Sequence, residues 1–288
     1  MPLVERAPAK INLGLHVLRK RPDGFHDVET VLHRIDWADT VTAQPAETLS
    51  MTCSDSALPT DRENLCMQAA RRLAEAFEVS AGAELHLEKR VPYGAGLGGG
   101  SSDAAATLRL LNRLWSLDAS PEDLHAIAAE IGADVPFFLN EVPAAYATGR
   151  GDEITALHAD AAPYRIPFPV VVAVPPIEVA TPEAYACVTP DDTDRPSLPS
   201  VVRANNPAHW REALANDFEA PIAAAHPEVA RLRDWLRDGG AAYVSLSGSG
   251  GAVYGVFEHE AEAEVLLDAA PDGDVRVHLI PAPPEGKS

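Results

Sequence analysis

The chain has 288 residues, of which 46% are hydrophobic and 23% charged, a composition typical of a soluble globular protein with one large domain or two. Its formal charge of −20, spread along the chain, argues against nucleic-acid binding, and no apolar stretch reaches the roughly 18 residues that cross a membrane. The N-terminal residues lack a signal-peptide pattern and the three cysteines lack metal-ligand spacing, so we expect a cytoplasmic protein with reduced thiols.

The first half of the chain alternates predicted strands with predicted helices. From Ile11 to Val17 apolar residues alternate with polar ones, the pattern of a half-buried strand. Apolar side chains at helical spacing predict a helix over 65–77, with Asn64 as its possible cap. The Ser120-Pro-Glu-Asp123 segment resembles a capping box, which predicts a helix that ends at Gly132. Further strands are predicted over 28–35 and 83–91, and residues 39–43 are expected to continue the sheet.

The second half begins after a proline-rich connection over 161–169, which predicts a domain boundary between residues 160 and 161. Residues 242–257 predict two strands joined by the glycine turn Ser247–Gly251, and residues 189–200 predict a loop. The remaining predicted elements are strands over 170–174 and 275–280 and helices over 208–223, 226–238 and 259–269.

The most informative segment runs from Val91 to Ala106 and carries five glycines within seven positions, followed by two serines and a helical pattern. So many glycines favour a backbone that bends sharply or closely approaches a ligand. Free N–H groups at the start of a helix, together with the helix dipole, favour a bound phosphate. The segment therefore predicts a phosphate-binding loop, and its alternative is a flexible surface loop ahead of a helix.

Two familiar phosphate-loop patterns fail on these glycines. A dinucleotide-binding fold needs a strand with an acidic end about 20 residues after G-x-G-x-x-G, whereas a second helix is predicted here. A Walker A loop needs lysine where Gly100 stands. A lysine that neutralises phosphate charge must therefore come from elsewhere in the chain.

A third pattern fits the segment that starts at Pro92. Pro92-x-Gly-x-Gly-Leu-Gly-Gly-Gly-Ser-Ser-x-Ala-Ala is similar to the second motif of the GHMP kinases, small-molecule kinases whose nucleotide phosphates lie under this loop. The chain also resembles, in order, the other motifs of the 4-diphosphocytidyl-2-C-methyl-D-erythritol kinase family, at residues 8–17, 21–30, 132–138 and 246–253. The resemblance covers roughly residues 6 to 257.

The resemblance implies an α+β fold with two domains. It implies an N-terminal ATP-binding and catalytic domain, like ribosomal protein S5 domain 2, over 1–160. A C-terminal ferredoxin-like GHMP domain over 161–288 then contributes to the substrate pocket. The implied reaction is ATP-dependent phosphorylation of the 2-hydroxyl of 4-diphosphocytidyl-2-C-methyl-D-erythritol in the non-mevalonate isoprenoid route, with Mg²⁺, by a monomer or weak homodimer.

Two alternatives to this activity stay open. One is another GHMP kinase, acting on homoserine, a mevalonate or a sugar. The other is a non-catalytic nucleotide-binding relative that kept the fold.

Lys10 and Asp134 are the catalytic candidates. Lys10 and Asn12 share one face of the first predicted strand because side chains alternate. The resemblance assigns Lys10 to charge stabilisation and Asp134 to the hydroxyl proton. The alternatives are a solvated lysine and an aspartate that caps a helix with Pro136 just inside it.

The substrate-binding candidates also follow from the resemblance. It places Asn12 at the hydroxyl, His26 at the edge of the cytosine, Phe25 in the same pocket and Tyr185 stacked on the base, with Thr181 a weaker candidate that can instead start a helix. The residues implied to bind ATP are Asn64, Leu65, Pro92, Gly94, Gly96, Leu97, Gly98, Gly99, Gly100, Ser101 and Ser102. No direct metal ligand is predicted, and His16, His33, His86 and His125 are expected to be structural or surface residues.

Overall fold

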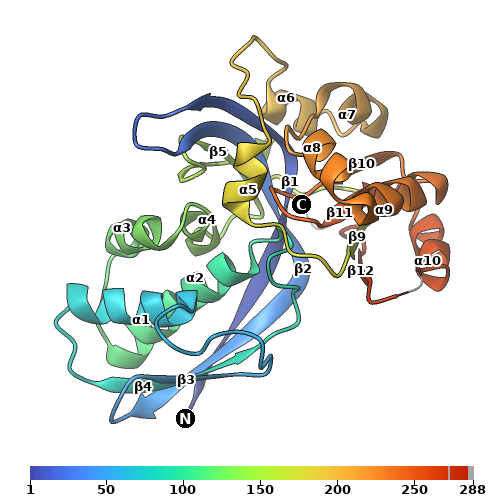
Figure 1. Ribbon diagram of the computed structural model, residues 1–288. Coiled ribbons are helices and arrows are strands. Elements are labelled where there is room, and N and C mark those ends of the chain that lie inside the picture. The colour runs from blue at the N-terminus through green and yellow to red at the C-terminus, as the bar shows by residue number, and fades with distance from the viewer. Residues whose placement is uncertain (272, 285–288) are drawn as a thin grey trace. The chain divides into compact units, whose positions relative to one another are not determined.

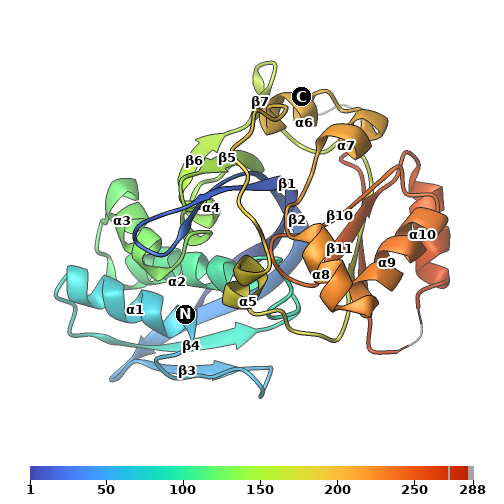
Figure 2. The same cartoon turned by 45° about the horizontal axis from the view of Figure 1, so that its top comes forward.

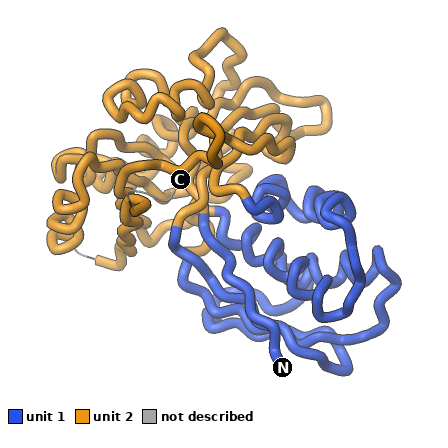
Figure 3. The backbone as a smooth tube through the Cα atoms, turned by 180° about the vertical axis from the view of Figure 1, so that it is seen from behind, with its two compact units in different colours: residues 1–9, 36–91, 98–141 blue, residues 10–35, 92–97, 142–288 orange. Residues whose placement is uncertain are grey.

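The chain folds into two compact units, each built from separate stretches of sequence (Figure 1, Figure 3). The computed structural model describes residues 1–271 and 273–284. Unit 1 comprises Met1–Ala9, Asp36–Val91 and Gly98–Glu141, and unit 2 comprises Lys10–Ile35, Pro92–Leu97 and Val142–Ser288. Both units mix helices and strands, which confirms the predicted α+β class. None of the helices in the described part of the chain has the length and hydropathy of a membrane span.

Two long strands, β1 (Leu3–Lys20) and β2 (His26–Ala46), pair with each other and contribute to both units. In unit 1, the end of β2 pairs with β4 (Gly82–Glu88), and β4 pairs in parallel with β3 (Ser50–Cys53). Helices α1 and α2 lie over one side of β3 and β4 (Figure 1). The helices of unit 1 are α1 (Leu65–Ala76), α2 (Gly99–Trp115), α3 (Pro121–Ile131) and α4 (Val135–Leu139).

Helix α2 occupies the centre of unit 1 because its side chains are small or apolar where it packs. Ala104, Ala105, Ala106, Leu108 and Leu111 are all fully buried, and α2 packs against both α1 and α4. Burial on this scale stabilises the unit by about 25 cal/mol per Å² of apolar surface removed from water. The packing fixes the position of the first turn of α2, which follows directly from the glycine loop.

Unit 2 is built around an antiparallel sheet with the order β10-β11-β9-β12. Helices α8, α9 and α10 lie beside this sheet (Figure 2). Val171, Leu236 and Val253 share the core between them, together with Leu15 of β1. The strands of the sheet are β9 (Val170–Val174), β10 (Tyr243–Leu246), β11 (Val253–Val256) and β12 (Arg276–Ile280). The helices of unit 2 are α5 (Thr181–Ala186), α6 (Leu198–Arg203), α7 (Pro207–Ala213), α8 (Glu219–Ala225), α9 (Pro227–Asp238) and α10 (Glu260–Asp268).

A second strand system of unit 2 extends from the hairpin of β1 and β2. Strand β5 (Ala144–Thr148) pairs with β2, so that Thr30 lies opposite Ala147, and β6 (Glu153–Ala156) pairs with β5. The short strands β7 (His158–Ala159) and β8 (Ala162–Pro163) form a hairpin of their own.

Three details of the predicted elements are wrong. The strand at Ile11–Val17 is buried on both faces rather than one. The predicted loop over 189–200 ends earlier, because α6 begins at Leu198. The helix predicted over 208–223 is interrupted between α7 and α8.

The interruption between α7 and α8 has a clear cause in the hydrogen bonds of β1. Leu15 N donates to Ala215 O at 2.8 Å, and Asp217 N donates to Leu15 O at 2.9 Å. The chain therefore leaves the helical conformation at 214–216 and forms a β-bridge between Asn216 and Leu15, which no local helical pattern reveals. The predicted boundary between residues 160 and 161 divides the chain into two continuous domains, whereas each compact unit combines separate stretches of sequence. The boundary therefore stays a prediction.

Candidate active site

The glycine loop adopts a backbone that only glycine accommodates easily. Gly94, Gly96 and Gly98 have φ angles of 69°, 85° and 68°, in the left-handed region. A Cβ on Gly96 would lie 2.1 Å from the carbonyl oxygen of Ser247. The glycine pattern therefore reflects both backbone conformation and close approach to another part of unit 2.

The start of α2 presents the features of an anion site within unit 1. Gly98 precedes the helix in the left-handed conformation, and Gly99 is its first residue. Ser102 is fully buried, and its Oγ has no hydrogen-bond partner among the described residues. A Cβ on Gly100 would lie 3.4 Å from Leu65 Cδ1, so Leu65 lies next to this turn. The arrangement suits phosphate oxygens, which accept hydrogen bonds from N–H groups and hydroxyls at a helix N-terminus.

Lys10 is held by two acceptors within unit 2. Its Nζ donates to Asn12 Oδ1 at 2.6 Å and to the Gly96 carbonyl at 2.8 Å, and its side chain is almost completely buried. Asn12 in turn donates through Nδ2 to Thr30 Oγ1 at 3.0 Å. The predicted proximity of Lys10 and Asn12 is therefore confirmed, and Lys10 is not the solvated lysine of the alternative interpretation.

The glycine turn Ser247–Gly251 packs directly on the glycine loop. Ser247 Oγ donates to the Gly96 carbonyl at 3.0 Å, and Ala252 N donates to the Ala95 carbonyl at 2.9 Å. A Cβ on Gly248 would lie 3.2 Å from Lys10 Nζ. This turn is therefore part of the surroundings of Lys10 and not only the tight hairpin that its local pattern suggested.

Asn64 caps α1, as the simpler interpretation of its position predicted. Its Oδ1 accepts from Cys66 N at 2.9 Å, and its Nδ2 donates to the Pro59 carbonyl at 2.8 Å. Its contact with adenine stays a prediction.

Asp134 in unit 1 is the residue immediately before α4, with Pro136 in the first turn. Its side chain makes no capping hydrogen bond to that helix. Capping therefore does not account for the aspartate at this position, although its catalytic role stays a prediction.

The aromatic candidates of unit 2 lie near the hairpin of β1 and β2. The rings of His26 and Tyr185 stack with centroids 4.7 Å apart, and Phe218 meets Tyr185 edge-on at 4.8 Å. Phe25 is 56% exposed, with the Arg150 guanidinium 5.2 Å from the centre of its ring. Burial, together with the charge of nearby Lys20, lowers the pKa of His26 and favours a neutral ring.

Thr181 is the first residue of α5 and is exposed. The structure thus supports the interpretation of Thr181 as a helix start, and its substrate contact stays a prediction.

Comparison with known proteins places these features in a family. The model of the GHMP kinases N terminal domain matches residues 64–141, and that of the GHMP kinases C terminal region matches residues 198–273. A protein of Salinibacter ruber named 4-diphosphocytidyl-2-C-methyl-D-erythritol kinase is 63% identical over 283 residues, covering 98% of this chain and 100% of its own length. The chain belongs to the 4-diphosphocytidyl-2-C-methyl-D-erythritol kinase family. A family member of Chlorobium chlorochromatii is 44% identical over 281 residues, with 96% of each chain covered.

Solved structures agree with this family. A crystal structure of a 4-(cytidine 5'-diphospho)-2C-methyl-D-erythritol kinase is 34% identical, with a TM-score of 0.76, and covers 98% of this chain and 100% of its own. A homoserine kinase from Cytophaga hutchinsonii shares the fold at 19% identity, with a TM-score of 0.74, 98% of this chain and 95% of its own covered. The GHMP kinase fold expected from the motifs is confirmed, and the chain is a small-molecule kinase of this family, whose phosphoryl donor is ATP.

The sequence patterns did not predict a buried cluster of charged side chains that adjoins Gly99. Lys89 Nζ donates to Asp39 Oδ2 at 2.5 Å and to Asp103 Oδ2 at 2.9 Å, all within unit 1. Asp39 Oδ1 also accepts from Val91 N at 2.9 Å, and a Cβ on Gly99 would lie 3.3 Å from Lys89 Nζ. The cluster therefore ties the end of β4 to the first turn of α2. The scarcity of lysine, four in the whole chain, was the one signal that pointed to Lys89.

Burial prevails at Asp103 in this cluster but not at Lys89. It raises the pKa of Asp103 to about 7, with a further rise from the charge of Asp39, against the opposing effect of Lys89. The pKa of Lys89 is raised because the two carboxylates outweigh the burial that lowers it.

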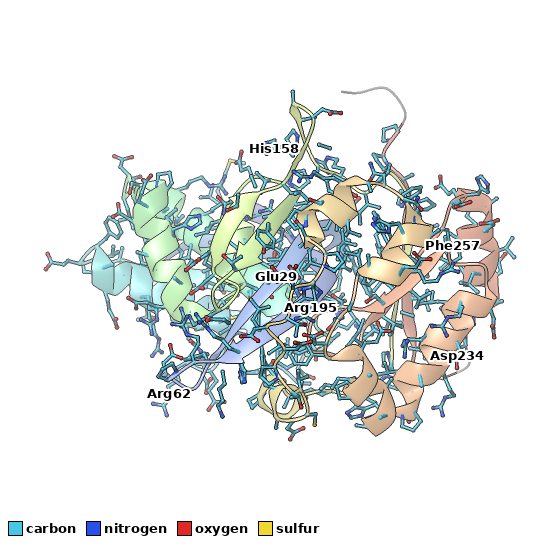
Figure 4. All side chains as sticks on the ribbon, turned by 90° about the horizontal axis from the view of Figure 1, so that it is seen from above. Glu29, Arg62, His158, Arg195, Asp234 and Phe257 are labelled. Atoms are coloured by element: carbon cyan, nitrogen blue, oxygen red, sulfur yellow. The ribbon has the colours of Figure 1, made fainter. Side chains whose placement is uncertain are left out.

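A second polar cluster lies along β1 and β2 in unit 2. Glu29 accepts from Tyr146 OH and contacts His16 Nδ1 at 2.7 Å, and Arg195 lies nearby (Figure 4). Burial alone raises the pKa of Glu29, but hydrogen bonds from Tyr146 and His16 outweigh it and lower that pKa. The cluster links β1, β2 and β5, so His16 has the structural role expected for it.

Proposed function

We propose that this protein transfers the γ-phosphoryl group of ATP to the 2-hydroxyl of 4-diphosphocytidyl-2-C-methyl-D-erythritol. The observation that carries the proposal is the 63% identity to a kinase of that name over nearly the whole of both chains. The hydrogen bonds that Lys10 Nζ and Ser247 Oγ both donate to the Gly96 carbonyl support it from the structural side. The product is the 2-phosphate, with ADP, in the non-mevalonate isoprenoid route.

The phosphates of ATP are proposed to bind along residues 92–102. Gly94, Gly96 and Gly98 are in the left-handed region, and the buried Ser102 Oγ lacks a partner in the described part of the chain. Asn64 and Leu65 are the proposed adenine contacts, and Leu65 adjoins Gly100.

Mg²⁺ is proposed to enter with the nucleotide. Within residues 1–271 and 273–284, no group of three or more His, Cys, Asp or Glu side chains is placed to hold a metal ion. Mg²⁺ commonly binds through substrate phosphates and waters rather than an all-protein cage, and Ser101 and Ser102 supply hydroxyls near the start of α2. When bound, Mg²⁺ neutralises part of the negative charge on the phosphate oxygens.

Phosphoryl transfer requires positioning and charge stabilisation more than covalent chemistry by the protein. The acceptor oxygen forms a bond to the γ-phosphorus while the bond from that phosphorus to the β–γ bridging oxygen breaks, and ADP leaves with the electron pair. We assign the hydroxyl proton to Asp134, charge stabilisation to Lys10 and orientation of the hydroxyl to Asn12.

The cytidyl end of the substrate is proposed to bind at the tip of the β1–β2 hairpin. Phe25 is exposed there, and we assign stacking on the base to Tyr185, whose ring stacks on His26 in this structure. The neutral ring of His26 has one N–H and one lone pair for the base edge. Thr181 begins α5, the helix that carries Tyr185, and its contact with the substrate is part of the proposal. A cytoplasmic location of the protein stays a prediction.

The test is an ADP-release assay with purified protein, ATP, Mg²⁺ and the cytidyl substrate, run beside homoserine, mevalonate and sugar alcohols. We expect release only with the cytidyl substrate and a loss of about 10²–10⁴ in kcat for Asp134→Asn. Preference for another alcohol would replace the proposed substrate. Failure to release ADP with every alcohol would instead favour a non-catalytic relative.

A further inference from the structure

Thr30 lies at the centre of the hydrogen bonds that hold the hydroxyl-binding side chains; it is the last residue of the motif at 21–30, and no role has been assigned to it above. It lies on β2, and its side chain is 3% exposed. Its Oγ1 donates to the Gly14 carbonyl at 2.6 Å and accepts from Asn12 Nδ2 at 3.0 Å. All of these atoms belong to unit 2.

The direction of each hydrogen bond in this network follows from which of its two groups can donate. A carbonyl oxygen only accepts, so the single proton of the Thr30 hydroxyl points to Gly14. Thr30 Oγ1 must then accept from Asn12, which places the amide NH₂ group on that side. The Asn12 carbonyl oxygen consequently faces Lys10, whose ammonium group only donates. One hydroxyl proton thereby selects one of the two amide orientations of Asn12.

The backbone conformation at Gly14 positions the carbonyl group that accepts from Thr30. Its φ of 74° lies in the left-handed region, and a Cβ there would lie 2.6 Å from Leu198 Cδ2. Such a residue interrupts the alternation of side chains along a strand. Leu15 therefore joins the apolar core while His16 bonds to Glu29, and the Gly14 carbonyl is directed to Thr30.

We propose that Thr30 is a positioning residue for phosphoryl transfer, which fixes the Asn12 amide so that its oxygen holds Lys10 Nζ; this inference rests on the proposed kinase function. Thr30 acts through Asn12 and Lys10 and does not itself touch the reacting atoms. In its absence the NH₂ group of Asn12 loses its acceptor, and the orientation of the amide depends on the Lys10 ammonium group. The Asn12 oxygen then holds Lys10 Nζ less firmly.

The substitution Thr30→Val tests the proposal because valine keeps the shape of threonine and removes only the hydroxyl. We expect kcat with the cytidyl substrate to fall about tenfold, the value of one hydrogen bond, with KM for ATP unchanged. Thr30→Ser restores the hydroxyl and should recover most of kcat. The matched control is Thr107→Val, which removes the buried hydroxyl that donates to the Asp103 carbonyl at 2.8 Å and should leave kcat within about twofold.

A double-mutant cycle with Asn12→Ala separates positioning from a general loss of stability. If Thr30 acts through Asn12, Thr30→Val adds nothing to kcat in the Asn12→Ala background. Additive losses, or no recovery in Thr30→Ser, overturn the proposal, as does full activity of Thr30→Val. Failure of the proposed function is distinguishable, because the unsubstituted protein would then release no ADP with the cytidyl substrate.

Discussion

Lys10 and Gly96 are 86 positions apart in the sequence, yet the Lys10 ammonium group donates to the Gly96 carbonyl at 2.8 Å. The same carbonyl accepts from Ser247 Oγ at 3.0 Å. Three motifs that are distant in sequence thus meet at one oxygen atom. A loop that changes its backbone at Gly96 must therefore also move the ammonium group of Lys10.

This arrangement predicts a large catalytic effect of Lys10→Ala. The substitution removes the positive charge held beside the glycine loop, and we expect kcat to fall by on the order of 10²–10⁴ with nucleotide affinity changed little. ADP release gives kcat, and calorimetric titration with ATP gives the affinity. Lys20→Ala removes an exposed lysine from the end of β1 and should retain kcat. Near-normal turnover by Lys10→Ala would contradict the role assigned to it.

Features that involve residues close together in the sequence could be predicted from local patterns. The step from Lys10 to Asn12 predicted their proximity because side chains two positions apart share a strand face. The glycine run followed by a helical pattern likewise predicted a bent loop at the start of α2.

What escaped prediction depends on contacts between distant segments. Asp39 and Asp103 reach Lys89 across separations of 50 and 14 residues, and no spacing rule connects them. The bridge between Leu15 and Asn216 broke a predicted helix for the same reason. Such features depend on tertiary hydrogen bonds, which override the intrinsic preference of a short segment.

The close packing of the two glycine turns predicts that Gly96→Ala is strongly destabilising. A left-handed φ costs a side chain about 1–2 kcal/mol, and the 2.1 Å approach to the Ser247 oxygen forces the backbone to shift as well. We expect the free energy of unfolding to fall by about 3 kcal/mol or more in a denaturant titration followed by tryptophan fluorescence. Gly240→Ala is the matched control, since its φ is 94° and no atom lies within 4 Å of the added Cβ. Equal losses in the two variants would show that the packing contributes nothing.

The environment of His26 predicts both substrate selectivity and a pH response. His26→Ala should raise KM for the cytidyl substrate about tenfold and leave KM for ATP unchanged. Burial first, and then the charge of Lys20, lower the pKa of His26, so protonation needs a lower pH than for an ordinary histidine. KM for the cytidyl substrate should accordingly stay flat from about pH 8 to 6.5 and rise only in more acidic buffer.

His158→Ala controls for this experiment, because His158 is exposed on β7 (Figure 4). Equal changes of KM for both substrates in His26→Ala would refute base recognition by this ring. A rise of KM that begins above pH 6.5 would contradict the lowered pKa.

The raised pKa of Asp103 predicts how stability changes with pH. In the unfolded chain this carboxyl group ionises near pH 4, whereas burial and the charge of Asp39 keep it protonated up to about pH 7 in the folded protein. Between these values the folded state binds the extra proton, so the contribution of Asp103 to stability decreases as pH rises. Asparagine carries no titrating proton. The stability of Asp103→Asn should therefore increase relative to that of the unsubstituted protein as the pH rises from about 4 to about 7.

We expect the free energy of unfolding of Asp103→Asn, minus that of the unsubstituted protein, to rise by at least about 1.4 kcal/mol between pH 5 and pH 8, the value of one pKa unit. Denaturant titrations of both proteins at fixed ionic strength measure this difference. Asp36→Asn removes an exposed carboxylate from the same unit and controls for the loss of one charge from a chain of formal charge −20. A difference that stays constant with pH, or that shifts toward the unsubstituted protein, would show that the Lys89 ammonium group outweighs burial and keeps Asp103 ionised.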